Sequence, residues 1–346
     1  MDISVFYKRK EFFPIIIALF NRNNVYLWGT AGSGKTQLAK ACAHYIIDFI
    51  KKKHNKQIEL YELSINQWTS PIDLIGGETP SGYREGLLSM AWKNGGVLLL
   101  DELPKIEPNT SGILNMALAQ TKIKNATISN GRGEKLIKHD NFYVIATGNT
   151  DMRNSTFNYG ANYKQDFSLI DRFSGAYFNI EKDENFEKAL ILKEKNKKYL
   201  GLYDFFSILR NVIEIKEINQ IISIRTILSL IDMFEYNYNQ IVNKKSLDIP
   251  NSYFLTNYFQ SSYTKDELKE LYDETDEYVN KNNIAYQLKS KITSDIEEYL
   301  KIDLNNISFI DLYIKLIDYY DGNYFTFLEE SILGVSGIGK KAAINI

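Results

Sequence analysis

The chain has 346 residues, of which 44% are hydrophobic and 24% charged, a composition typical of a folded protein with two or three domains. Wholesale disorder and fibrous repeats are excluded. The 41 Lys and Arg nearly balance the 43 Asp and Glu, so no chain-wide field exists to hold a polyanion or an acidic membrane. Basic residues outnumber acidic ones by 30 to 26 up to residue 242, whereas acidic residues lead by 17 to 11 after it.

The first apolar run, Phe12 to Phe20, contains Pro14 and is nine residues long. A membrane-spanning helix needs about 20 apolar residues, so we expect this run to be a helix packed on the core and expect no membrane segment. Cys42 is the single cysteine, which excludes an intrachain disulfide and fits a reducing compartment, with the cytoplasm as the expected location.

Between residues 24 and 180, short runs rich in β-branched and aromatic residues alternate with longer helical patterns. This alternation is typical of βαβ units and predicts an α/β domain with a parallel sheet covered on both faces. The five expected strands are Val25 to Trp28, Ile58 to Leu63, Val97 to Leu100, Tyr143 to Ala146 and Ala176 to Ile180. Glycines at 131 and 133, between two further short apolar runs, predict a β-hairpin that protrudes between Lys122 and Asn141.

After Ile180 the apolar residues recur every three or four positions, which predicts helices. We expect three domains: an α/β nucleotide-binding core over 1–182, a small helical lid over 183–242, and an acidic helical domain over 243–346. The sequence Thr264 to Glu267 has the Ser/Thr-x-x-Glu form of a capping box and marks a helix start in the third of them.

A complete G-x-x-x-x-G-K-[ST] motif follows the first strand and precedes a helical pattern, the context that identifies a phosphate-binding loop. Its residues are Gly29, Thr30, Ala31, Gly32, Ser33, Gly34, Lys35 and Thr36. Backbone N–H groups of such a loop and the positive end of the following helix face the phosphates of a nucleotide. We expect Lys35 to meet the β- and γ-phosphates and Thr36 to ligate Mg²⁺.

Two further strands end in polar residues at the edge of the sheet where ligands bind in open α/β folds. Asp101 and Glu102 follow a run of four apolar residues. Asp101 can hold Mg²⁺ through water, and Glu102 can polarise the water that attacks the γ-phosphate. Asn149 ends the strand that begins near Tyr143, and its amide can donate to the γ-phosphate and orient that water.

Arginine is rare in this chain, and a guanidinium is suited to phosphate oxygens. Arg172, in Asp-Arg-Phe before the last predicted strand, and Arg225, in Ser-Ile-Arg at a helix start, are plausible phosphate sensors. The alternative is a surface ion pair, the role expected of Arg84 and Arg210.

Together, the phosphate loop, the Leu-Leu-Leu-Asp-Glu strand, the Ala-Thr-Gly-Asn strand, Asp-Arg-Phe and Ser-x-Arg resemble an AAA+ ATPase over residues 24 to about 228. The sequence is most similar to the MoxR, CbbQ and GvpN group, to which the dynein-related modules are related. Supporting segments are Ser70 to Gly77, Gly86 to Gly96 and Tyr159 to Asn162. The resemblance implies that Arg172 is an arginine finger reaching a neighbouring subunit and that Arg225 is the second sensor, from the lid.

The resemblance implies a Mg²⁺-dependent ATPase that forms a homo-oligomer, expected to be a hexameric ring, and remodels a protein client, often one with a von Willebrand A domain. The alternatives are a nucleic-acid motor or loader and a GTP-using relative. Support for nucleic acid comes from a glycine-containing tail, Leu333 to Ala343, which resembles a DNA-binding helical hairpin, and from basic residues of the expected β-hairpin, which equally suit a solvated surface. The basic residues are Lys122, Lys124, Arg132, Lys135 and Lys138.

Overall fold

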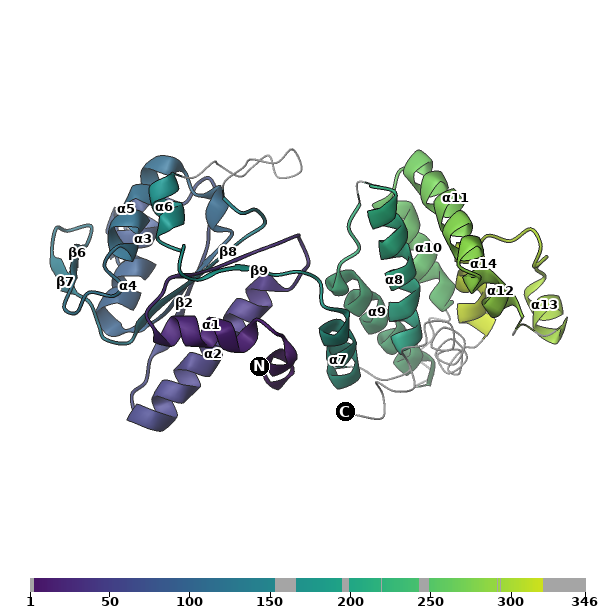
Figure 1. Ribbon diagram of the computed structural model, residues 1–346, viewed down its shortest axis with the longest axis horizontal. Helices are drawn as coiled ribbons and strands as arrows, with labels where there is room; N and C mark the ends of the chain where they lie inside the picture. Colours follow the sequence, from purple (N-terminus) through teal and green to yellow (C-terminus); the bar gives the residue numbers. More distant parts are fainter. Residues whose placement is uncertain are drawn as a thin grey trace. The chain divides into compact units, whose positions relative to one another are not determined.

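The computed structural model describes residues 3–152, 166–194, 199–218, 220–242, 249–290, 292 and 294–319, apart from a few side chains at the ends of these ranges. The chain divides into two compact units, Met1–Phe186 and Glu187–Ile346, and each is described by itself (Figure 1). The first unit is an α/β layer structure and the second is helical.

A parallel sheet of five strands forms the centre of the first unit, as the alternation of patterns predicts. Its strands are β1 (Val25–Trp28), β2 (Glu59–Ser64), β5 (Gly96–Asp101), β8 (Phe142–Gly148) and β9 (Tyr177–Asn179), in the spatial order β2-β5-β8-β1-β9. The inner strand β8 is buried along its whole length, which agrees with its largely apolar sequence. Pairing of Leu100 with Ala146 and of Trp28 with Gly148 brings the carboxyl ends of three strands to one level.

Helices cover both faces of this sheet (Figure 1). Successive residues of a strand point to opposite faces, and Leu98 and Leu100 pack into one cluster with Trp92, Leu114 and Phe173. These partners come from the helical side made of α3 (Pro71–Ile75), α4 (Leu87–Asn94), α5 (Pro108–Leu118) and α6 (Phe167–Asp171). The other face is covered by α1 (Phe12–Phe20) and α2 (Lys35–His54).

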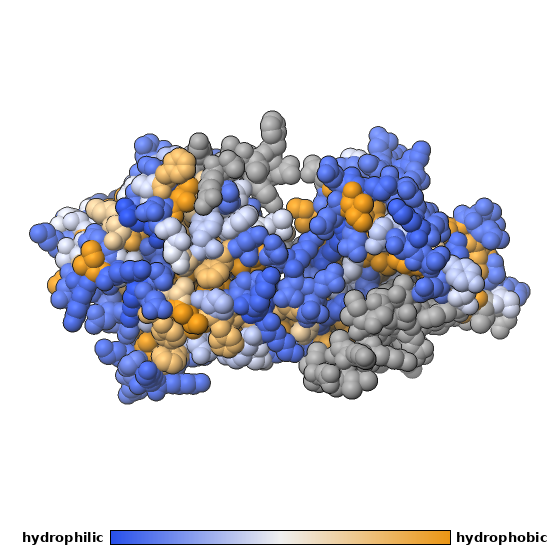
Figure 2. Space-filling view, in the orientation of Figure 1, coloured by the Kyte–Doolittle hydropathy of each residue, from blue (hydrophilic) through white to orange (hydrophobic). Residues whose placement is uncertain are grey.

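Helix α1 packs on the unit as predicted, with Phe12, Ile15 and Leu19 fully buried. Its other side carries Phe13 and Ile17, which are 48% and 60% exposed. The space-filling view shows this apolar surface over α1 (Figure 2). Helix α1 follows the short 3₁₀ helix η1 (Ser4–Lys8) along the chain.

Two antiparallel hairpins extend this unit. The predicted one is present as β6 (Thr127–Ser129) and β7 (Lys135–Ile137), and a second, β3 (Gly77–Thr79) with β4 (Gly82–Arg84), was not predicted. The two hairpins contact each other, because Arg132 pairs with Glu78 at 3.0 Å and lies over the ring of Tyr83. Trp92 Nε1 donates to the carbonyl of Leu136 at 3.1 Å, so the predicted hairpin is anchored to α4.

The second unit consists of helices around one hydrophobic core. They are α7 (Glu184–Glu194), which starts in the first unit, then α8 (Leu200–Ile215), α9 (Ile224–Val242), α10 (Asn251–Ser262), α11 (Lys265–Lys281), α12 (Ile284–Lys289), α13 (Ser294–Leu300) and α14 (Phe309–Tyr319). The core extends from Ile191 to Ile317, and the rings of Phe205 and Tyr313 stack at 3.8 Å within it. Helices on both sides of residue 242 therefore share this core, and the division into a lid and a third domain stays a prediction.

The predicted capping box begins α11. Glu267 N–H donates to Thr264 Oγ1 at 3.3 Å, and the Glu267 carboxylate accepts from the Thr264 N–H at 2.8 Å. The bonds that the Glu267 carboxylate accepts from the N–H and the hydroxyl of Thr264 hold the pKa of Glu267 below its usual value. The tail Leu333 to Ala343 and the segment Tyr159 to Asn162 lie outside the described residues.

Candidate nucleotide-binding site

The predicted phosphate loop connects β1 to α2 at the carboxyl edge of the sheet. Helix α2 begins at Lys35, directly after Gly34, whose φ of 85° lies in the left-handed region that glycine adopts without strain. Because this 20-residue helix begins at the loop, the positive end of its dipole lies there. The loop and the helix start thus form the anion-binding arrangement that the motif predicts.

Lys35 lies inside this loop and is only 6% exposed. Its Nζ donates to the carbonyl oxygens of Gly29 at 3.0 Å and Thr30 at 2.8 Å. Burial lowers the pKa of Lys35 to about 8, and the nearby carboxylates of Asp101 and Glu102 act in the opposite direction. A further negative charge next to the Lys35 ammonium, such as a phosphate, would raise its pKa again.

Asp101 accepts hydrogen bonds from hydroxyls on two neighbouring elements. Thr36 Oγ1, in the first turn of α2, donates to Asp101 Oδ1 at 2.9 Å, and Thr147 Oγ1, near the end of β8, donates to the same oxygen. The predicted pair Thr36 and Asp101 is thus in direct contact. Thr147 was not assigned a role from the sequence, although a hydroxyl that is 1% exposed in an otherwise apolar strand is a signal that could have identified it.

Glu102 has a φ of 61°, a left-handed conformation that is uncommon for a residue other than glycine. Its N–H donates to Thr147 Oγ1 at 3.2 Å, and its carboxylate forms an ion pair with Lys105 in the following turn. Such backbone strain costs about 1 kcal/mol or more and persists where neighbouring bonds enforce it. Thr147 therefore orients Glu102 as well as Asp101.

Asn149 follows β8 at the level of the phosphate loop, because Trp28 pairs with Gly148 and the next residues are Gly29 and Asn149. The end of β8 is tightly fitted: a Cβ at Gly148 would lie 2.0 Å from Tyr26 Oη. The Tyr26 hydroxyl also donates to the carbonyl of Thr150 at 2.6 Å. The half-buried Asn149 is thus fixed at the same edge as Lys35.

Arg172 lies at the opposite edge of the sheet. Its carbonyl accepts from Asn24 Nδ2 at 2.9 Å, and Asn24 comes directly before the first residue of β1, whereas the phosphate loop follows the last one. A four-residue strand spans about 13 Å. The guanidinium donates to Asn115 Oδ1 of α5 at 2.8 Å. The structure therefore does not bring Arg172 to the phosphate loop of its own chain.

Arg225 belongs to the second unit. It lies exposed in the first turn of α9, where Ser223 Oγ accepts from the N–H of Thr226 at 3.2 Å and caps the helix. The expectation for Arg210 is wrong: this side chain is 6% exposed and donates to Glu187 at 2.5 Å and to the carbonyl of Ile222 at 2.8 Å. Arg210 is buried because it joins α7, α8 and the turn before α9.

The basic surface expected on the β6–β7 hairpin is smaller than the sequence suggests. Lys138 is 7% exposed, and its Nζ donates to the carbonyl of Thr121 at 2.9 Å. Arg132 is engaged with Glu78 of the neighbouring hairpin. Two of the five basic residues are thus used within the fold.

The contact between Thr36 and Asp101 fits a hard divalent cation, because a hydroxyl and a carboxylate oxygen are ligands that Mg²⁺ prefers. Across the part of the chain that the structure describes, no group of three or more His, Cys, Asp or Glu could hold a metal ion by itself. Mg²⁺ sites typically combine one or two protein oxygens with water and phosphate oxygens, and Thr36 and Asp101 could supply the protein oxygens of such a site.

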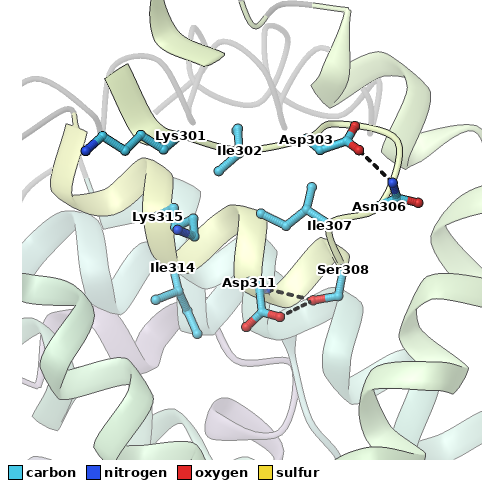
Figure 3. Close-up of a pocket in the computed structure, with 9 residues that line it drawn as sticks. All are labelled: Lys301, Ile302, Asp303, Asn306, Ile307, Ser308, Asp311, Ile314 and Lys315. Atoms are coloured by element: carbon cyan, nitrogen blue, oxygen red, sulfur yellow. Dashed lines mark hydrogen bonds between the residues drawn. The ribbon is translucent and has the colours of Figure 1, made fainter. Parts of the chain in front are cut away.

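A separate cavity of about 340 Å³ lies in the second unit, between the turn after α13 and the start of α14 (Figure 3). Its carboxylates serve the local structure: Asp303 accepts from Asn306 Nδ2 at 2.6 Å, and Asp311 accepts from Ser308 Oγ at 2.9 Å. We assign no ligand to it. Among the residues described, no helix is long and apolar enough to cross a membrane.

Comparison with known proteins points to the same class of fold. Residues 24–173 match the AAA domain family of the dynein-related subfamily. The uncharacterized protein YojN of Bacillus subtilis (strain 168) is 32% identical over 139 residues, which are 40% of this chain and 43% of YojN. The chain thus spans less than half the length of that relative.

Two solved structures match this chain at low identity. A closed state of Hsp104 with ATPγS and casein is 21% identical with a TM-score of 0.36, over 49% of this chain and 31% of that one. NtrX from Brucella abortus is 15% identical with a TM-score of 0.41, over 89% and 66%. The family match over residues 24–173 and the five-stranded parallel sheet support an AAA+ fold for the first unit.

Proposed function

We propose that this protein is a Mg²⁺-dependent ATPase that works as a ring and remodels a partner protein. The observation that carries the proposal is the contact of Asp101 with Thr36 and Thr147, next to the buried Lys35 and the strained Glu102. These contacts support a phosphate site, a cation site and a catalytic acid at one edge of the sheet.

Lys35 and the backbone N–H groups of the loop would bind the β- and γ-phosphates, and Thr36 and Asp101 would hold Mg²⁺. When bound, Mg²⁺ supplies positive charge to the phosphate oxygens. The Glu102 carboxylate would take a proton from the attacking water, whose oxygen bonds to the γ-phosphorus as the bond to the bridging oxygen of ADP breaks. Asn149 would orient this water through its amide. Lys105, paired with Glu102, would limit the conformations of that carboxylate before water enters.

The position of Arg172 supports action across a subunit boundary, since it lies at the far end of β1 from its own phosphate loop. Nearby exposed residues on the same helices, Phe167 at 71% and Met116 at 50%, suit a surface buried by another copy. Figure 2 shows apolar side chains at this end of the unit, over α5 and α6. A contact between different faces of identical subunits forms a ring when its rotation closes, and the resemblance to the MoxR group favours six subunits. Arg225 would then contact nucleotide as the second sensor.

A protein client is favoured over a nucleic acid by the charge distribution. The near-neutral chain has an acidic last third, which repels phosphate, and Lys138 of the hairpin is buried. We propose chaperone-like activity of the MoxR type, with a client that can carry a von Willebrand A domain. The single, buried Cys42 suits a reducing compartment such as the cytoplasm.

The experiment that tests this function is affinity capture with Glu102→Gln held in its ATP-bound state, with Lys35→Ala as the matched variant that binds no nucleotide. A protein retained by the first variant and lost with the second supports the proposal. Retention of nucleic acid instead would favour the motor or loader, and a preference for GTP in binding would favour the GTP-using relative.

A further inference from the structure

Arg9 is a buried charge that the proposed chemistry does not use. It follows η1, and it is 3% exposed although it lies in a segment of basic residues that the sequence places outside the nucleotide-binding motifs. A buried guanidinium is costly unless its donors are satisfied, so its partners indicate its role.

The three nitrogens of Arg9 donate to three different parts of the chain. Nη1 donates to the carbonyl of Ser33 at 3.1 Å, Nη2 to the carbonyl of Glu181 at 2.7 Å, and Nε to the carboxylate of Glu11 at 3.3 Å. Ser33 belongs to the phosphate loop. Glu181 lies between β9 and α7, on the segment by which the chain leaves the sheet for the helical unit.

The same guanidinium packs on an aromatic ring at the end of this exit segment. Arg9 Cζ lies 5.0 Å from the ring centroid of Phe186, which is the last residue of the first unit. Phe6 of η1 contacts the same ring at 5.1 Å. One side chain thus joins the phosphate loop to residues 181–186.

The bond to Ser33 fixes the orientation of a peptide in the loop. In a planar trans peptide, the C=O of one residue and the N–H of the next point in opposite directions. With the Ser33 carbonyl held by Arg9, the Gly34 N–H is directed away from Arg9. A charge-assisted bond to the carbonyl also polarises this peptide, which strengthens the N–H as a donor to phosphate.

We propose that Arg9 is a positioning residue that couples the conformation of the phosphate loop to the exit segment 181–186. The proposal rests on the proposed function, since it requires that the loop bind a nucleotide. A phosphate that accepts from the Gly34 N–H stabilises the peptide orientation that Arg9 holds, and Arg9 in turn holds Glu181 and Phe186. By linkage, the factor by which bound nucleotide stabilises this conformation of the exit segment equals the factor by which this conformation raises the affinity for nucleotide.

The test compares Mg-ADP binding and amide hydrogen exchange in the full chain with those of Arg9→Met, Arg9→Lys and the control Lys8→Met, which removes an exposed charge one residue away. We expect Arg9→Met to bind Mg-ADP about tenfold more weakly, as for the loss of one charge-assisted hydrogen bond. Saturating Mg-ADP should protect amides of residues 29–36 in wild type and in every variant. It should protect residues 181–186 in wild type and Lys8→Met but not in Arg9→Met.

Arg9→Lys keeps the charge, but one ammonium on a single stem replaces a fork that reaches both carbonyls. We expect Arg9→Lys to retain most of the affinity for Mg-ADP and to lose the Mg-ADP-induced protection of residues 181–186. This variant therefore tests the coupling even if Arg9→Met fails to fold. A role in stability alone would raise exchange in both segments and leave the Mg-ADP-induced protection intact, and that result would overturn the coupling. Wild-type affinity in Arg9→Met would overturn it as well. Absence of binding by the wild type would instead refute the proposed function and the role of Arg9 with it.

Discussion

Replacement of Thr147 by valine removes one hydroxyl from the candidate site while nearly preserving side-chain volume. This hydroxyl donates to Asp101 and accepts from the N–H of Glu102, so its loss removes one of the two hydroxyls bonded to Asp101 Oδ1 and leaves the Glu102 N–H without this partner. Hydrogen bonds to charged groups contribute about 1.5–3 kcal/mol. We expect a loss of about 2 kcal/mol in the free energy of unfolding on that basis.

The effect on catalysis should exceed the effect on binding. Without the bond to Thr147, Glu102 loses a contact that maintains its left-handed backbone, and its carboxylate moves from the proposed position of the water. A misplacement of about 1 Å can lower a rate about 100-fold, so we expect kcat for phosphate release to fall by about that factor. Nucleotide affinity, set mainly by Lys35 and the loop, should change by less than about tenfold.

The assay is steady-state phosphate release together with equilibrium unfolding in denaturant. Thr121→Val is the matched control: Thr121 is 6% exposed, and its hydroxyl donates to the carbonyl of Leu118 at 3.2 Å, away from the phosphate loop. It should be destabilised without a selective loss of kcat, whereas Thr147→Ser should retain most of the activity. Equal kcat in Thr147→Val and wild type, or an equal loss in Thr121→Val, would refute the reasoning.

Three further predictions follow from the same geometry. Because burial lowers the pKa of Lys35 to about 8, only about a quarter of the Lys35 amines in the free protein carry the extra proton at pH 8.5, and a bound triphosphate should raise that pKa again. Calorimetry in buffers of different ionisation enthalpy should therefore record uptake of about 0.7 proton on nucleotide binding at pH 8.5 and little uptake at pH 6.5. A binding enthalpy at pH 8.5 that does not depend on the buffer would contradict this prediction. Mixing inactive Arg172→Ala with inactive Lys35→Ala subunits should restore some ATPase activity, because some interfaces then combine an intact loop with an intact arginine; no recovery in verified mixed rings would count against action across subunits. A chain ending at Val242 should lose protection from proteolysis in α8 and α9 but keep it in the sheet, because Phe205 loses the stacked Tyr313; resistant α8 and α9 would show that their core does not need the later helices.

The sheet was predictable because its central strands β5 and β8 are largely apolar and its strands alternate with helical patterns. Continuous burial of β8 leaves a signal in every residue. The β3–β4 hairpin was not predictable in the same way, since its strands have three residues each and Tyr83 of β4 packs against Arg132, which lies far along the chain. Patterns of period two do not develop over such short strands.

The residues of the candidate site also differ in how well the sequence predicts them. The loop, Asp101 and Glu102 were found because their spacing along the chain reflects a local strand-to-helix arrangement. Thr147 and Arg9 were missed because their roles depend on contacts with residues 46 and 24 positions away, and no local pattern records such contacts. The same reason explains Arg210, which looks like a surface residue in the sequence and is buried by Glu187 and Ile222.

The most direct test of the central claim is a comparison of ATP binding and phosphate release in the wild type, Lys35→Ala and Glu102→Gln. We predict that the wild type binds ATP and releases phosphate in the presence of Mg²⁺, that Lys35→Ala does neither, and that Glu102→Gln binds ATP as the wild type does but releases phosphate at least about 100-fold more slowly. Phosphate release by Glu102→Gln at the wild-type rate would contradict the assignment of Glu102, and ATP binding by Lys35→Ala with wild-type affinity would contradict the site itself.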